Sequence, residues 1–322
     1  MPTLSGTLRD RLLTPDPAEA TFAKRGFHAR DPQTRDHLEQ AGGNFLTGFK
    51  HAMVSRDLGE AARLLGTVER PYQGFAYEGA AMAFAIVDAI TPWRSAKLPE
   101  FIAGAADPHV YMANVGAGWA MARLPRPLWR RIRLPDPLLR WLAADGYGFH
   151  QAYFATERHV TRREPPRLRL PWPDGTRYAS RAADQGVGRA LWFVCGGDVE
   201  RLAATIGGFG PGRRADLWSG AGLAATYAGG GDGADLEKLR KLASGFRAEV
   251  AQGAAFAAAT RLRAGLVVPH TAVATDVFCG SSVEEASAIT QDTLHGLPAD
   301  GAMPAYEAWR RRIQAVYRPA EG

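Results

Sequence analysis

Three ionisable residues stand among small apolar neighbours and could handle protons or hold an anion. Glu78 precedes a Gly-Ala-Ala run, and apolar surroundings raise the pKa of a carboxyl group into the range that suits acid–base chemistry. His150 replaces the alanine of a phrase that recurs along the chain, and Arg189 could bind a carboxylate or phosphate. Structural alternatives are a helix N-terminal acid for Glu78, a core imidazole for His150 and an ion pair for Arg189. The candidate partners of Arg189 are Asp184, Asp198 and Asp216.

Aromatic side chains accompany these three residues and would surround a pocket if their helices converge at one rim. We expect Glu78 and His150 to be the catalytic groups. The expected substrate-binding residues are Tyr77, Trp119, Phe149, Arg189, Trp192, Trp218, Ser219, Tyr227 and His270. A bowl of rings with one carboxylate, one imidazole and one guanidinium suits an extended apolar ligand.

A second group of reactive residues lies within ten positions, from His270 through Asp276 to Cys279. A Cys–His nucleophile or a zinc site completed by Cys195 is an option, but neither has the spacing of a known motif. Cys195 stands in an apolar helical stretch, which favours burial. We therefore expect no metal ion. We also expect no cofactor, since the glycine strings 116–118, 186–188 and 207–212 lack the context of a nucleotide-binding loop.

One phrase recurs six times: a glycine, an alanine two places on and usually an aromatic residue three places later. Its glycines are separated by 39, 30, 40, 34 and 31 residues, and they are Gly79, Gly118, Gly148, Gly188, Gly222 and Gly253. A period of roughly 35 residues predicts stacked pairs of one inner and one outer helix, with each glycine opening an inner helix. Chance alignment is the alternative, because the chain contains 36 glycines.

The expected fold class is therefore mainly α, built of repeated helix pairs that close into an α/α toroid, with an open α-solenoid as the alternative. We expect an irregular lead-in over 1–34 and one helical-repeat domain over 35–322. A proline-rich loop or short hairpin is expected at about 164–179.

Local signals predict individual helices outside the glycine phrases. Capping residues are expected at Asp198 and in the box from Ser282 to Glu285. Further helices are predicted over 34–53, 57–65, 80–90, 135–144 and 235–264. A last helix should begin at Pro304, with Tyr306, Trp309, Ile313 and Val316 facing inward.

Composition narrows the function classes. The chain has 322 residues, 46% hydrophobic and 22% charged, which is ordinary for one large or two smaller globular domains. Two cysteines, no apolar run of membrane-spanning length and no signal peptide predict a cytoplasmic protein. The net charge of +6 invites a nucleic-acid partner. However, the basic stretches 123–133 and 158–169 are interrupted by proline and apolar residues, which favours a solvated face or a surface for an anionic partner.

Several longer strings resemble the UnbL-type accessory proteins of enediyne gene cassettes. The strings are Arg25–His28, Gly74–Gly79, Gly146–His150, Gly188–Phe193 and Asp216–Gly230, and the resemblance spans about 20–317. It implies a bacterial protein of secondary metabolism, encoded beside an enediyne polyketide synthase that makes a linear conjugated polyene. It also implies companions that include a thioesterase and a membrane-integral protein. It brings no established catalytic residues.

These observations together predict an enzyme that acts on the polyene-derived intermediate by proton transfer or cyclisation. The expected partners are a polyene or polyyne, the polyketide synthase and the membrane-integral protein of the cassette, with no nucleic acid. Attachment to the membrane through a partner is compatible with this reading. The alternatives are a carrier or chaperone that shields the polyene, and a scaffold that binds only protein.

Overall fold

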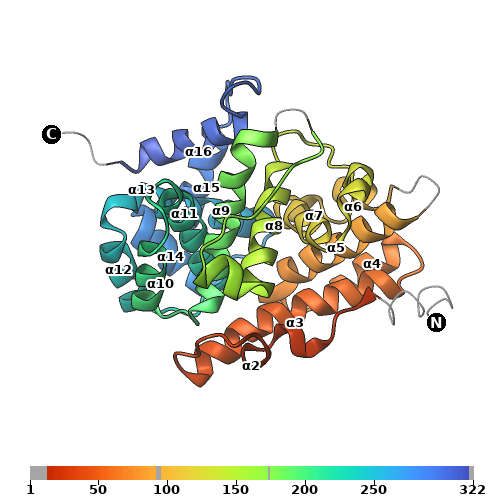
Figure 1. Cartoon of the computed structure of the whole chain (residues 1–322), viewed down its shortest axis with the longest axis horizontal. Helices are drawn as coiled ribbons and strands as arrows, with labels where there is room; N and C mark the ends of the chain where they lie inside the picture. The colour runs from red at the N-terminus through yellow and green to blue at the C-terminus, as the bar shows by residue number, and fades with distance from the viewer. Residues whose placement is uncertain (1–12, 92–95, 173–174, 319–322) are drawn as a thin grey trace. The chain divides into compact units, whose positions relative to one another are not determined.

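The computed structural model describes residues 13–91, 96–172 and 175–318, and these ranges contain helices and turns but no strand (Figure 1). The mainly α fold expected from the sequence is thereby confirmed. The chain forms two compact units, Met1–Gly26 with Glu39–Tyr147, and Phe27–Leu38 with Gly148–Gly322. The closed ring, the open solenoid and the single domain over 35–322 remain predictions.

The first unit is built around one almost completely buried helix, α5 (Gln73–Ile90), which contacts α4, α6 and α7. Its other helices are α2 (Phe22–Arg25), α4 (Leu58–Leu65), α6 (Lys97–Ala103) and α7 (Val110–Arg123), with the larger part of α3 (Pro32–Val54) and the first half of α8 (Trp141–Phe154). Short 3-10 helices are η1 (Pro17–Ala20), η2 (Arg70–Tyr72), η3 (Asp107–His109) and η4 (Arg126–Arg131).

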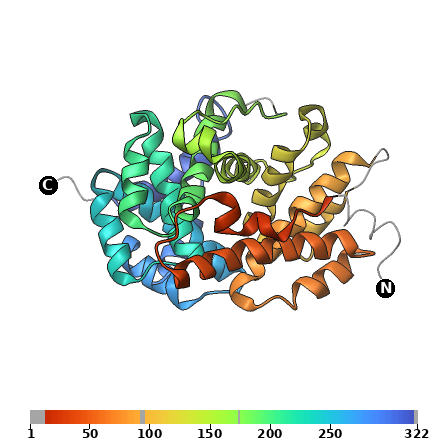
Figure 2. The same cartoon turned by 60° about the horizontal axis from the view of Figure 1, so that its bottom comes forward.

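The second unit contains two rows of helices that alternate along the chain. The inner row is α9 (Gly175–Val194), α11 (Pro211–Ala228) and α13 (Arg247–Arg263), and the outer row is α10 (Val199–Gly207), α12 (Gly233–Leu242) and α14 (Pro269–Cys279). Neighbours within each row are in contact, as Figures 1 and 2 show, so three helix pairs stack in order. Then α15 (Val283–Asp292) and α16 (Ala305–Val316) pack on α13.

The local signals for helix starts are confirmed at three places. The Asp198 side chain accepts a hydrogen bond from the backbone N–H of Arg201, and Asp57 caps α4 in the same way. Ser282 and Glu285 form the complete capping box of α15. Helix α3 extends one or two residues beyond the predicted 34–53 at each end.

Other expectations for individual elements are wrong. The stretch 235–264 is two helices, because Ser244–Phe246 forms a 3-10 turn between α12 and α13. The helix expected over 135–144 begins only at Trp141, after Pro135 and Pro137. Val316 is 54% exposed, whereas the other expected inward residues of α16 are buried.

Two regions that were expected to be irregular contain some helix. The lead-in contains η1 and α2, each opened by a side-chain cap, and residues 1–12 lie outside the described part. Residues 163–172 form no regular element and no hairpin, so only the loop expected at about 164–179 is found. The rest of the expected loop, from Gly175 onward, belongs to helix α9, and Asp174 lies outside the described residues.

All six glycines of the recurring phrase lie inside helices, at the points where two backbones come closest. A Cβ atom on any of them would overlap a backbone carbonyl oxygen of the neighbouring helix. The helices begin between six residues (Gln73 to Gly79) and thirteen residues (Gly175 to Gly188) before the glycine. The prediction that each glycine opens an inner helix is therefore wrong, and the rim of helix N-termini expected around a pocket is not formed by these residues.

The close approaches are reciprocal. Gly48 of α3 meets the carbonyl of Ala76, and Gly79 of α5 meets the carbonyl of Phe45. Gly188 of α9 and Gly220 of α11 form a second such pair. The remaining glycines of this kind, which likewise meet a neighbouring backbone, are Gly116, Gly118, Gly146, Gly148, Gly222 and Gly253. Glycine is required here because any side chain would push the helices apart.

Two glycines of α3 give a direct test of this packing. We expect Gly48→Ala to lower the free energy of unfolding by about 1–3 kcal/mol, because the new methyl group overlaps the α5 backbone. Gly43→Ala, in the same helix, meets nothing within 4 Å and should raise it by about 0.5–1 kcal/mol through better helix propensity. Urea unfolding followed by circular dichroism measures both, and changes of the same sign would contradict the assignment.

Candidate functional site

Aromatic rings of α8 and α9 meet in the second unit and form the candidate site. Phe149 stacks on Tyr153 with ring centroids 5.7 Å apart, and its edge meets Phe193 at 5.6 Å. Phe149 and Tyr153 lie four residues apart on α8, so both point to one face. Gly148 lets α8 approach the backbone of α9 at Ala183, and this close approach brings the two sets of rings into contact.

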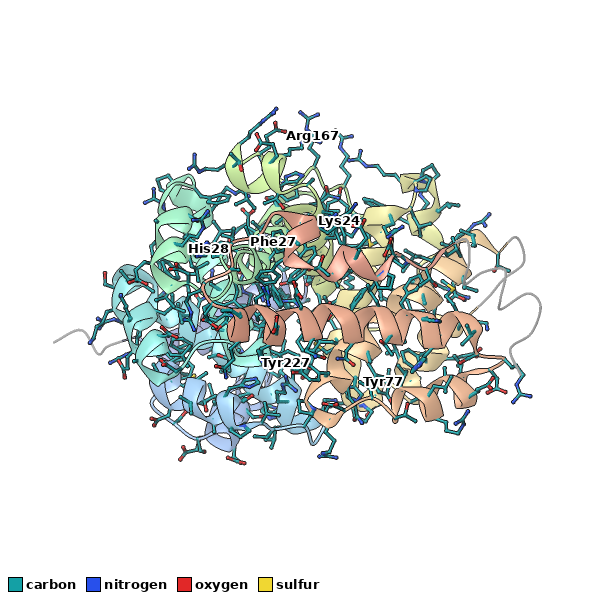
Figure 3. The ribbon with its side chains drawn as sticks, turned by 90° about the horizontal axis from the view of Figure 1, so that it is seen from below. Lys24, Phe27, His28, Tyr77, Arg167 and Tyr227 are labelled. Carbon is teal, nitrogen blue, oxygen red and sulfur yellow. The ribbon has the colours of Figure 1, made fainter. Side chains whose placement is uncertain are left out.

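A guanidinium and a further ring complete this cluster. The Arg189 guanidinium lies 5.1 Å from the Phe149 ring centroid, in cation–π geometry, and Arg189 is only 7% exposed. Phe27 meets Tyr153 edge to face at 4.8 Å. The backbone N–H of His28 donates to the Val194 carbonyl, which holds the segment containing Phe27 against the end of α9. Phe27 and His28 are labelled in Figure 3.

The cluster becomes more accessible at the carboxyl end of α8. His150 and Phe154 are half-buried, and their rings lie 4.6 Å apart. Phe149, Tyr153 and Phe193 are nearly buried, at 5–6% exposure. Chemically, this is an apolar wall with a cation at one side and an imidazole at the more exposed end. Such a wall can hold a conjugated chain by area burial and stacking, and the imidazole can exchange a proton.

Sequence reasoning had placed Phe149, His150 and Arg189 at the site but had not assigned Phe27, Tyr153, Phe154 and Phe193 to it. For three of these four a signal was present. Each follows a predicted site residue by four positions in a helix: Tyr153 after Phe149, Phe154 after His150 and Phe193 after Arg189. Phe27 lies far away in sequence, and nothing local connects it with α8.

An ion pair was the structural alternative for Arg189, and the three carboxylates considered for it contact other groups. Asp184 pairs with Arg213, with Oδ1 to Nη2 at 2.5 Å. Asp198 caps α10 and lies 3.4 Å from the His28 Nε2. Asp216 belongs to a buried network with two other arginines.

Three predicted substrate-binding residues meet at the carboxyl end of α11, where Trp192 and His270 bond to backbone carbonyl groups, one of them that of Tyr227. The Trp192 indole N–H donates to the Gly229 carbonyl at 2.8 Å, and the His270 Nε2 lies 3.1 Å from the Tyr227 carbonyl oxygen. Arg261 donates to the same oxygen and lies over the Tyr227 ring at 4.0 Å. These contacts cap a helix end that would otherwise leave buried acceptors unsatisfied.

Burial lowers the pKa of His270 to about 4, and the nearby charges of Arg261 and His37 act in the same direction. The hydrogen bond to Tyr227 opposes this shift. The rings of His270 and His37 meet edge to face at 5.9 Å, and the His37 Nε2 lies 2.6 Å from the Ala228 carbonyl oxygen. Both imidazoles thus donate from Nε2, and His270 is neutral at pH 7.

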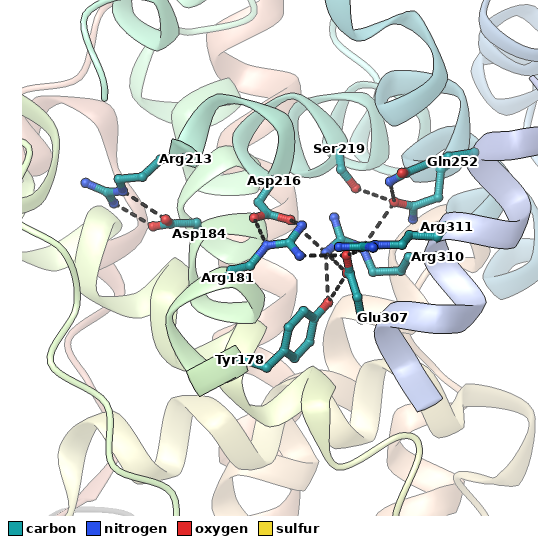
Figure 4. A network of polar contacts seen from close by, with 11 residues as sticks. Tyr178, Arg181, Asp184, Arg213, Asp216, Ser219, Gln252, Glu307, Arg310 and Arg311 are labelled. Atoms are coloured by element: carbon teal, nitrogen blue, oxygen red, sulfur yellow. Dashed lines mark hydrogen bonds and ion pairs between the residues drawn. The ribbon is translucent and has the colours of Figure 1, made fainter. Parts of the chain in front are cut away.

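Trp218 and Ser219 lie near the middle of α11. Trp218 is 4% exposed and Ser219 is fully buried. The Ser219 hydroxyl donates to the Gln252 Oε1 at 2.8 Å. Gln252 in turn accepts from the Arg310 Nε at 3.2 Å, so Ser219 lies at the edge of the buried polar network in Figure 4.

This network centres on Arg310 of α16, which is fully buried. Its Nη1 donates to the Asp216 carboxylate at 2.8 Å and to the Tyr178 hydroxyl at 2.9 Å. Arg181 forms two hydrogen bonds with Asp216 and one with Glu307. The network thereby ties α16 to α9 and α11 (Figure 4).

The charges of the network compensate one another. Burial opposes ionisation of Glu307, but the charges of Arg310 and Arg181 outweigh it and hold the pKa of that carboxyl below its ordinary value. Burial would lower the pKa of Arg310, and the surrounding anionic groups raise it instead. Glu307 and Arg310 therefore both remain ionised although they are buried.

The first unit contains the other predicted site residues. Glu78 of α5 is 2% exposed, and its carbonyl oxygen adjoins Gly116 of α7. Tyr77 stacks on His109 at 3.8 Å and on Phe101 at 5.7 Å, and burial raises the pKa of its hydroxyl. Trp119 lies 4.4 Å from Phe45.

The Cys–His nucleophile considered from the sequence is not assembled. His270 and Cys279 both belong to α14, but nine residues at 100° each place them on opposite faces of that helix. Burial raises the pKa of Cys279 to about 12 and that of Cys195 to about 11, so both thiols stay protonated. Among the described residues, no three His, Cys, Asp or Glu side chains gather where they could share a metal ion.

The fold and this site define a mainly α protein with glycine-mediated helix contacts and a buried cluster of aromatic rings. The chain belongs to the family described as Protein of unknown function (DUF1702), whose model matches residues 4–317. Comparisons with curated proteins and with solved structures found no match. Within the described residues, no helix has both the length and the apolar composition needed to cross a bilayer.

Two adjacent arginines of α16 test the buried network. We expect Arg310→Met to lower the free energy of unfolding by about 3–5 kcal/mol, because it removes a charge between buried carboxylates. Arg311→Met removes a contact with the same Glu307, but its side chain is 58% exposed, so the loss should stay below about 1 kcal/mol. Equal losses in urea unfolding at pH 7 would contradict this difference.

The lowered pKa of His270 predicts an acid-sensitive stability. In the unfolded chain His270 binds a proton below its ordinary pKa of 6.5, whereas in the folded protein it binds one only below about pH 4. The free energy of unfolding therefore falls as the pH drops from 6.5 to about 4. We expect His270→Gln to remove about 1–3 kcal/mol of that fall while keeping an N–H donor for Tyr227. Unfolding curves from pH 7 to pH 4 measure the difference, and parallel curves for the two proteins would refute it.

Proposed function

We propose that this protein is an accessory protein of enediyne core biosynthesis that binds the conjugated polyene and acts on it by proton transfer or cyclisation. The observation that carries the proposal is the α8–α9 cluster, where stacked rings, a cation–π arginine and a half-buried imidazole occur together. The sequence resemblance to the UnbL-type proteins supplies the class of substrate. Proton transfer and cyclisation by isomerisation need no external oxidant, so the chain's own acids and bases suffice.

The roles follow from the chemistry of each group. The rings of Phe149, Tyr153 and Phe193 would line the apolar chain, and Arg189 would hold a polar end. His150 would take up and return a proton, since an imidazole titrates near neutral pH. Glu78 is the proposed second proton-handling group, because it is a nearly buried carboxyl-bearing residue of α5.

A carrier or chaperone is the second candidate. It is favoured by the predominance of rings over ionisable groups in the cluster, which would shield a reactive polyene without transforming it. The two candidates share the binding step and differ in whether His150 and Glu78 are needed for product.

Binding can be tested with the polyene released from an enediyne polyketide synthase. On addition of the protein, we expect its absorbance band to shift as the chain enters aromatic surroundings. Phe149→Leu should weaken binding roughly five- to tenfold through lost stacking. Phe256→Leu is the matched control, because Phe256 belongs to a separate cluster with Tyr306 and Trp309. Equal effects of the two substitutions would argue against a site at α8 and α9.

Catalysis is tested separately from binding. If the protein is an enzyme, Glu78→Gln and His150→Ala should abolish the mass or absorbance change of the bound polyene in a folded protein. If it is a carrier, both variants keep binding the polyene and support normal product formation in cells. Normal product from both variants would exclude the catalytic roles.

A further inference from the structure

One of the two basic stretches of the chain, residues 123–133 of the first unit, is an exposed arginine segment. It runs from the last residue of α7 through the 3-10 helix η4 and carries five arginines and no acidic residue. All five side chains are exposed, and they are Arg123, Arg126, Arg130, Arg131 and Arg133. The six residues of η4 span only about 12 Å, so the positive charge is concentrated.

Two apolar residues of this segment, Trp129 and Ile132, are buried and hold it against the rest of the first unit. Trp129 is 3% exposed, its indole N–H donates to the Leu124 carbonyl at 3.0 Å, and its ring meets Tyr147 at 5.7 Å. Ile132 is buried as well. Arg131 donates to the Ala89 carbonyl at 3.1 Å and so pins η4 to the end of α5. These contacts fix the backbone that carries the arginines.

The other basic stretch behaves differently. Within 158–169, Arg158 pairs with Glu164 at 2.7 Å and Arg162 pairs with Glu157 at 3.1 Å. Two of its cations are thus neutralised by residues of the same region. The segment 123–133 contains no acidic residue within its own sequence, so its positive charges are not offset inside the segment itself.

We propose that the exposed arginine segment is a docking surface for an acidic protein surface. Guanidinium groups pair bidentately with carboxylates and are weakly hydrated, so an arginine-only patch suits such a partner. A bilayer is disfavoured because the segment's Trp129 and Ile132 are buried and cannot anchor in lipid. A nucleic acid is disfavoured because its only aromatic side chain, Trp129, is buried and cannot stack on a base.

Under the proposed function, on which this assignment rests, the partner is the polyketide synthase that delivers the polyene. The acidic surface is then one that the synthase presents where its acyl chain leaves. Complementary charge would raise the rate of encounter and orient the two proteins, and it would make their association sensitive to salt.

The test uses the full chain and a full-length enediyne polyketide synthase that carries no polyene, with binding followed by surface plasmon resonance. The variant Arg123→Gln/Arg130→Gln/Arg133→Gln should bind about tenfold more weakly. The matched control Arg158→Gln/Arg162→Gln/Arg169→Gln removes the same charge from the other stretch and should change binding less than about twofold. Raising the salt from about 50 to about 300 mM should weaken binding of the wild type.

Thermal unfolding by circular dichroism verifies that both triple variants are folded. Equal weakening by the two variants would overturn the proposal, as would no binding of the wild type at low salt. Vesicles of phosphatidylglycerol and phosphatidylcholine, or a single-stranded oligonucleotide, that displaced the synthase would also overturn it. A polyene-binding assay without the synthase separates the two proposals. The triple variant of 123–133 should bind the polyene as the wild type does. If the wild type does not bind the polyene, the proposed function is wrong, while the docking result stands.

Discussion

The rest of the structure depends on the close approach of helix backbones at glycine. Each buried helical glycine costs about 1 kcal/mol of helix propensity relative to alanine, so a row of them is unfavourable for isolated helices. Contacts between neighbouring helices offset this cost. Carbonyl oxygens and Cα atoms of adjacent helices come into direct contact and gain dispersion and weak Cα–H···O interactions. Because these gains exist only in the packed state, the helices and their packing stabilise one another.

The spacing of the glycines also determines which helices lie in the middle of a row. Two glycines separated by one residue differ by 200° around a helix, so they face opposite sides. In α7, Gly116 adjoins α5 and Gly118 adjoins α8; in α11, Gly220 adjoins α9 and Gly222 adjoins α13. A Gly-x-Gly string inside a helix therefore marks a helix held closely between two neighbours. The same string in a strand-to-helix turn would have indicated phosphate binding, and the absence of a preceding strand separates the two meanings.

Much of the fold could be predicted from sequence because its signals are local. Capping at Asp198 and Ser282 and the helical spacing of the glycine phrases involve residues within one or two turns of each other. The place of each glycine within its helix could not be predicted, because close backbone approach is a property of the neighbouring helix. For the site, the i,i+4 relation joins Phe149 to Tyr153, whereas the contact of Phe27 with Tyr153 depends on how the chain folds back. Tyr227 and His270 had been assigned to a ligand for their chemistry, and in the structure they complete a helix end.

Glycine and alanine surfaces fit closely but carry little information about register, since small side chains are alike from one turn to the next. The buried network supplies what they lack. Asp216 of α11 accepts from Arg181 of α9 and from Arg310 of α16 in fixed geometry, and a shift of α16 by one turn would separate the buried Arg310 from Asp216. Charge in the interior gains little free energy over a hydrophobic core, but misplacing it is very costly, so the network penalises every register except the native one. The close backbone contacts thus allow the helices to pack, and the polar contacts select a single position of α16 against α9 and α11.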